Sequence, residues 1–75
     1  MTDEEYKTIA LDWYGSARAF PPHAQEAMAK ARDAVDRMLQ ASSEHGPRSE
    51  QVNSIAAEAS RLFTEAGRVL VAKCN

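Results

Sequence analysis

A chain of 75 residues has room for one domain, and a core of this size buries only about 60% of the surface that the unfolded chain exposes, which leaves a thin margin of stability. Its 9 Lys and Arg residues are scattered among 11 Asp and Glu residues, which argues against DNA binding, because DNA-binding proteins concentrate positive charge on one face or tail. The acidic N-terminus is unlike a secretory signal, no apolar run is long enough to span a membrane, and Cys74 is the only cysteine, so we expect one cytoplasmic domain over residues 1–75 with no membrane association.

The first predicted helix spans residues 3–18. Thr2 is its expected N-cap, and Glu5 follows three residues later, which is the spacing of a capping box. Pro21 and Pro22 stop this helix. Its apolar residues recur at steps of three and four and form one stripe that we expect to pack on the rest of the chain: Tyr6, Ile9, Ala10, Trp13 and Ala17.

Two longer helices are predicted over residues 22–43 and 48–73. Proline suits the first turn of a helix, where backbone N–H groups lack partners anyway, so Pro22 opens the first of them. Gly46 is a suitable C-cap in the left-handed conformation, and Ser49 lies at the start of the next helix. No strand-like alternation of useful length occurs, so the predicted fold class is all-α.

Both long helices carry apolar residues at alternating steps of four and three, which is the pattern of a heptad seam. A short connection forces the two helices antiparallel, and folding the chain about His45 brings their seams into register. The expected layers are Met38 with Val52, Val35 with Ile55, Ala31 with Ala59, Met28 with Leu62, and Ala24 with Ala66. Facing alanines require the axes to approach to about 8 Å. The predicted architecture is therefore an antiparallel helical hairpin with a shorter N-terminal helix, a three-helix unit.

Apolar positions outside the seam predict a further contact. The first helix is shorter than the hairpin and can cover only part of one side of it. We expect four large residues to stay uncovered: Leu39, Phe63, Leu70 and Val71. Because a monomer rarely exposes such a patch, the sequence predicts a homodimer that forms a larger helical bundle.

Charged residues on the long helices follow a spacing of four. This spacing predicts four weak ion pairs on exposed faces, each worth about 0.2–0.5 kcal/mol: Glu26–Lys30, Arg32–Asp36, Asp33–Arg37 and Arg61–Glu65. We interpret them as solvated surface rather than as a site.

Groups suited to catalysis or metal binding are sparse. The serines lack the glycine-framed turn of a nucleophile elbow, and the three glycines are isolated rather than part of a phosphate loop. In the predicted hairpin, Cys74 lies near the His23 end and His45 at the other end. Two ligands do not make a zinc site, which typically needs three or four. We therefore predict no catalytic residues, no metal site and no cofactor, and a protein that is not an enzyme.

Most of the aromatic residues fall in the first predicted helix and its exit. Trp and Tyr dominate interface hot spots, and a helix that is apolar on two sides needs two contacts. The leading hypothesis is a small adaptor or inhibitor that binds another protein through this helix. Its predicted contacts are Leu11, Trp13, Tyr14, Phe63 and Leu70.

An alternative hypothesis is an oligomeric protein that sequesters a small ligand such as a nucleotide. An aromatic side chain would stack on a base (Tyr6, Trp13 or Tyr14), and a cation would neutralise phosphate (Lys30, Arg61 or Arg68). Pairing with glutamates accounts for the arginines more simply. In helix order the chain is similar to small phage proteins that sequester cyclic nucleotides, and its alanine-rich composition suggests a bacterial or phage protein. A third alternative, binding of structured RNA, is disfavoured by the acidic balance.

Overall fold

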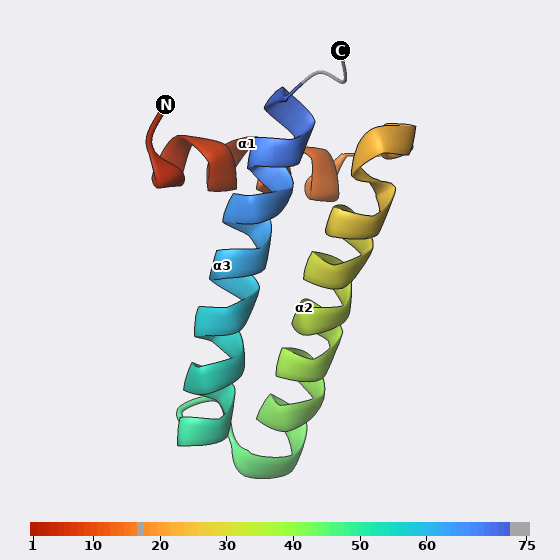
Figure 1. Cartoon of the computed structure of the whole chain (residues 1–75). Coiled ribbons are helices and arrows are strands. Elements are labelled where there is room, and N and C mark those ends of the chain that lie inside the picture. The colour runs from red at the N-terminus through yellow and green to blue at the C-terminus, as the bar shows by residue number, and fades with distance from the viewer. Residues whose placement is uncertain (17, 73–75) are drawn as a thin grey trace.

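The computed structural model describes residues 1–16 and 18–72. These residues form helix α1 (Asp3–Gly15), a 3₁₀ turn η1 (Pro22–Ala24), helix α2 (Gln25–His45) and helix α3 (Glu50–Val71). Helices α2 and α3 run antiparallel as a long hairpin, and α1 lies crosswise behind the end of the hairpin at which α3 finishes (Figure 1). The predicted all-α hairpin with a shorter N-terminal helix is therefore confirmed.

The helix ends differ from the predicted ones by a few residues. Helix α1 ends at Gly15 instead of continuing to residue 18, because Ser16 adopts an extended backbone and its hydroxyl donates to the carbonyl of Trp13. The second helix begins as the separate turn η1 and runs to His45 rather than to residue 43. The third begins at Glu50, two residues later than predicted, and its predicted end at residue 73 lies outside the described residues.

The helix caps follow the sequence closely. Thr2 and Glu5 form the predicted capping box, in which the Glu5 backbone N–H donates to the Thr2 hydroxyl oxygen. The Thr2 backbone N–H donates to the Glu5 carboxylate and lowers the pKa of that carboxyl. Ser49 accepts a hydrogen bond from the backbone N–H of Val52 at the start of α3. Gly46 ends α2 with a φ of 91° and a ψ of 152°, so the positive φ is as expected but the backbone is not in the left-handed helical region.

The hairpin interface contains the predicted seam. Every seam residue is buried or half-buried, and Ala31 and Ala59 are at most 5% exposed. The alanines at Ala34 and Ala41, which lie beside the predicted seam on α2, are buried as well. The close approach of the two helices therefore rests on a broader band of small residues than one heptad line.

Helix α1 crosses α3 at a point where both helices carry small residues. Ala10 is fully buried there, and a methyl group added at Gly67 would overlap the backbone carbonyl of Tyr6. The ring of Tyr14 packs edge-on against Phe63, with 5.4 Å between ring centroids. Tyr14 lies outside the predicted stripe of α1 but packs on the core all the same, because α1 turns its Ala10 side, rather than its Ile9 side, toward α3.

Two of the four predicted surface ion pairs are present, Glu26–Lys30 and Asp33–Arg37. Among the described residues, Arg32–Asp36 and Arg61–Glu65 do not form ion pairs. Other pairs join helices instead, since Arg37 also reaches Glu58 across the hairpin and Arg68 reaches Asp3 at the start of α1.

Candidate functional site

The aromatic residues predicted to bind a partner do not gather on one free surface. Phe63 is only 3% exposed, because Tyr14 covers it, and it belongs to the core rather than to the uncovered patch that the sequence predicted. Trp13 is half-buried, and the guanidinium of Arg18 lies 4.1 Å from its ring centroid. Leu11 alone among the five predicted contacts is exposed, at 45%.

Of the apolar residues on which the dimer prediction rests, some are exposed and others are covered. Leu39 and Val71 are exposed, whereas Phe63 is buried and Leu70 is half-buried against the core. The uncovered apolar surface is therefore smaller than predicted. The homodimer stays a prediction, and light scattering at micromolar concentration tests it.

The residues predicted to bind a ligand are only partly brought together. Arg61 and Arg68 line a polar concavity of about 460 Å³ between α1 and α3, which we call the α1–α3 concavity. Arg68 lies over the ring of Tyr6, and its hydrogen bond to Asp3 raises the pKa of its guanidinium. Lys30 lies elsewhere, on α2, and does not line this concavity. The remaining lining of this concavity is mixed in charge: Asp3, Glu4, Lys7, Ala57, Ser60, Thr64 and Glu65.

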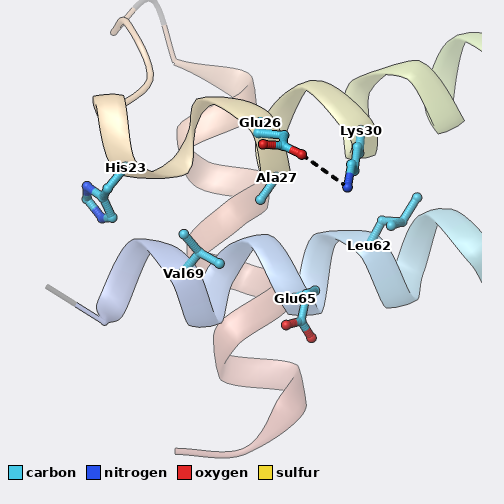
Figure 2. A pocket seen from close by; sticks show the side chains of 7 residues that line it. All are labelled: His23, Glu26, Ala27, Lys30, Leu62, Glu65 and Val69. Carbon is cyan, nitrogen blue, oxygen red and sulfur yellow. Dashed lines mark ion pairs between the residues drawn. The ribbon is translucent and has the colours of Figure 1, made fainter. Parts of the chain in front are cut away.

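A second concavity lies between the first turns of α2 and the last turns of α3, on the side of the hairpin away from α1 (Figure 2). We call it the Leu62 groove, and its volume is about 300 Å³. Leu62 and Val69 point from α3 toward α2, where Ala27 faces them with its single methyl group (Figure 2). Its full lining is His23, Glu26, Ala27, Lys30, Leu62, Glu65 and Val69.

Small and large residues at corresponding positions produce this hollow. Ala27 leaves space on α2, whereas Leu62 and Val69 are half-buried and keep part of their aliphatic surface in contact with water. These two residues are seven apart, so they lie in line along α3. A concave, largely apolar surface with polar groups at its margin is the usual form of a binding site.

Ion pairs define the margins of the groove. The carboxylate of Glu26 lies 3.4 Å from the ammonium group of Lys30 along the α2 side (Figure 2). Further toward the hairpin turn, Arg37 bridges to Glu58 on α3 at 3.0 Å, one helical turn before Leu62. This second ion pair joins the two helices but lies outside the lining of the groove.

The sequence did contain a signal for this groove. Ile55, Leu62 and Val69 recur every seven residues, and all three are half-buried, whereas the parallel line of Val52, Ala59 and Ala66 is buried. The predicted heptad seam combined both lines of residues, and it therefore did not show that one line is more exposed than the other. The α3 helix in fact presents its Ile55–Val69 line at the edge of the hairpin interface.

Within residues 1–16 and 18–72, no three His, Cys, Asp or Glu side chains gather as a metal ion would require. Over the same ranges, no helix combines the length and the apolar composition needed to cross a membrane. The chain matches no family model, and no curated protein or solved structure is significantly similar to it.

Proposed function

We propose that this protein is a non-enzymatic helical interaction module that binds another protein, and that the partner docks in the Leu62 groove. One observation carries the proposal, namely that Leu62 and Val69 stay partly exposed beside Ala27 in an apolar hollow. A partner side chain that fills such a hollow removes apolar surface from water, which is the main favourable term in protein association.

The aromatic helix has a different role in this proposal from the one that its composition suggests. Tyr14 and Ala10 fasten α1 to one side of α3, and this support holds α3 in place against α2. The groove then lies on rigid helices rather than on loops, and a preorganised site loses less entropy when it binds. We therefore assign α1 to the support of the docking surface, with Leu11 as its one exposed large apolar residue among the predicted contacts.

A photo-crosslinking residue placed at the groove tests the proposal in the cells that produce the protein. Position 30 lies at the groove margin, and position 57 lies in the α1–α3 concavity and serves as the matched exposed control. We expect a discrete adduct with a different protein from position 30 and none from position 57. Adding Ala27→Leu to the same chain should suppress the adduct, because the larger side chain occupies the hollow.

Three outcomes contradict docking in the groove. They are the absence of any adduct from position 30, the same adducts from positions 30 and 57, and an adduct that survives Ala27→Leu. An adduct with the mass of two identical chains shows that a second copy occupies the groove, and it contradicts the proposal of a different partner.

A second candidate function, sequestration of a small phosphorylated ligand, is favoured by the shared position of Arg61 and Arg68 in the α1–α3 concavity. A ligand would have to displace Asp3 from Arg68, since these two side chains are already paired. A panel of nucleotides tests this candidate by thermal unfolding, because a ligand that binds only the folded state raises its melting temperature. An unchanged melting temperature at millimolar nucleotide excludes the sequestering function.

A further inference from the structure

Helix α1 buries fewer of its own residues than either helix of the hairpin. Ala10 is its one buried residue, whereas α2 has four and α3 has five. Most of its contacts are with α3, and few are with α2. A helix of 13 residues is too short to be stable alone in water, so α1 stays helical only while it is packed against α3.

The polar contacts that hold the first turns of α1 are open to water. Asp3 pairs with Arg68 of α3, and both side chains are largely exposed. The ammonium group of Lys7 donates to the hydroxyl of Ser60 at 3.4 Å, which is long for a hydrogen bond. Contacts between exposed charges add little to stability, so these groups do not fix α1 firmly in place.

The apolar contacts of α1 are concentrated near its end, where Trp13 and Tyr14 are half-buried against the core. The ring of Tyr14 covers Phe63 edge-on. At the crossing itself, Ala10 and Gly67 bring the two backbones together but have almost no side chain to remove from water. The attachment of α1 therefore depends mainly on its two rings.

The hairpin has contacts of its own in the half that α1 does not reach (Figure 1). Near the turn, Val52 of α3 and Ala41 of α2 are buried, and Arg37 bridges to Glu58 between the two helices. The hydroxyl of Ser49 caps the start of α3. These interactions do not involve α1, so release of α1 leaves them in place.

The segment that follows α1 shows where a moving part would end. The guanidinium of Arg18 lies over the ring of Trp13 and pairs with Asp12, so this residue is tied to α1. The carbonyl of Pro21, by contrast, accepts a hydrogen bond from the backbone N–H of Ala24 in the turn that opens α2. The boundary between the two parts therefore lies between Arg18 and Pro21.

We propose that α1 opens from α3 as one unit while the α2–α3 hairpin stays folded, so that α1 is a releasable cover over Phe63. Opening breaks the Asp3–Arg68 pair and the contact of Tyr14 with Phe63. It brings into water the apolar side of α3 at Phe63, which is only 3% exposed while α1 is in place. Elements with few buried contacts open in this way at a lower free energy than the whole domain. This inference concerns the side of α3 away from the Leu62 groove and does not depend on the proposed function.

Native-state hydrogen exchange of the full chain tests this inference. We expect the hydrogen-bonded amides of α1, including that of Ala10, to share one opening constant. This constant should be at least about tenfold larger than that of the amides at Ala34 and Ala59 in the hairpin. Low concentrations of urea should change it little, because release of α1 exposes much less surface than unfolding of the whole chain.

A substitution far from α1 separates its release from unfolding of the whole chain. Val52→Ala weakens the hairpin equally whether α1 is docked or released, since Val52 is buried near the turn. Loss of its two methyl groups should raise the opening constants of the hairpin amides by about tenfold and those of α1 by less than about twofold. Ala41→Gly is the milder variant if Val52→Ala does not fold, and it should raise the hairpin constants about fivefold.

Two substitutions within α1 test how it is attached. Tyr14→Ala should raise the opening constant of α1 by at least about tenfold, because the contact with Phe63 is lost. Leu11→Ala is the matched control, since Leu11 is exposed on the same helix, and it should change this constant by less than about threefold.

Four results overturn the proposal. Equal opening constants for α1 and the hairpin in the unaltered chain, or an α1 constant that rises with the hairpin constants in Val52→Ala, show that the two parts unfold together. Protection that is graded from the ends of α1 toward Ala10, or a Tyr14→Ala effect no larger than that of Leu11→Ala, shows that the helix frays in place instead of leaving α3 as a unit.

Discussion

The two sides of helix α3 differ in how completely another helix covers their apolar side chains. On one side, Gly67 lets the backbone of α1 approach closely, and Tyr14 then covers Phe63 almost completely. On the other side, Ala27 of α2 is also a small residue, but no helix of the described chain covers the exposed parts of Leu62 and Val69. The comparison shows that small residues create both a tight crossing and an open groove, and that the presence of a covering helix decides between them.

The largest expected difference between the two sides is in the free energy of unfolding that is lost when neighbouring residues of α3 are replaced by alanine. Phe63→Ala should cost about 3–5 kcal/mol, because a buried ring is lost and a cavity remains. Leu62→Ala should cost only about 1 kcal/mol, since part of this side chain is already in water. Urea unfolding followed by circular dichroism measures both values. Similar losses for the two variants would show that both sides of α3 are covered in solution.

The loss expected for Phe63→Ala is large relative to the free energy of unfolding of the whole domain. A chain of this length has a free energy of unfolding of about 4–11 kcal/mol. Phe63→Ala therefore removes a large fraction of it, and Phe63→Leu is the milder variant that keeps the chain folded if the alanine variant does not fold. It should fall between the two alanine variants.

The next largest expected loss of stability comes from replacing Gly67, where α1 crosses α3. Gly67→Ala should destabilise the protein by about 1–3 kcal/mol, because the added methyl group meets the backbone of Tyr6, which no side-chain rotation can relieve. Gly15→Ala is the matched control, since nothing lies near the added methyl group at that helix position. The control should be neutral or stabilise the protein by up to about 1 kcal/mol through helix propensity.

The Gly67 variant also tests how independent the two sides are. We expect nuclear magnetic resonance signals of α1 to shift or broaden, while those of Ala27 and Val69 in the groove change little. A Gly67→Ala variant as stable as the unaltered chain would contradict the close crossing.

The sequence predicts the helices and their pairing well because these depend on local chemistry. Thr2 and Glu5, Gly46, and the alanines of the hairpin each determine a cap, a chain reversal or a close approach with their near neighbours. These features confirm the predicted all-α hairpin.

The orientation of α1 and the position of the groove could not be predicted in the same way. Helix α1 has apolar residues over a wide arc, and its inward face is set by Gly67, which is more than fifty residues away in the sequence. Likewise, Leu62 and Phe63 are equally apolar neighbours, and only the placement of α1 decides which one is covered. Both questions depend on tertiary packing, which periodicity within one helix does not contain.

The smallest expected effect concerns the ion pairs on the two sides of α3. Asp3–Arg68 joins α1 to α3, and Arg37–Glu58 joins α2 to α3. Double-mutant cycles with Asp3→Asn and Arg68→Gln, and with Arg37→Gln and Glu58→Gln, should each give only a small coupling, because all four side chains are at least partly exposed to water. In the first cycle, the stabilising interaction of Asp3 with the α1 helix dipole cancels, because it does not depend on Arg68.

Hydrogen exchange distinguishes the two pairs even where their energies are alike. Loss of the Asp3–Arg68 pair should speed exchange of the α1 amides by about twofold to fivefold and leave those of α2 unchanged, because α1 is held mainly against α3. Loss of the Arg37–Glu58 pair should leave the α1 amides unchanged. If both losses instead speed exchange everywhere by the same factor, α1 opens only together with the hairpin, and the two sides of α3 form one cooperative unit rather than a covered side and an independent groove.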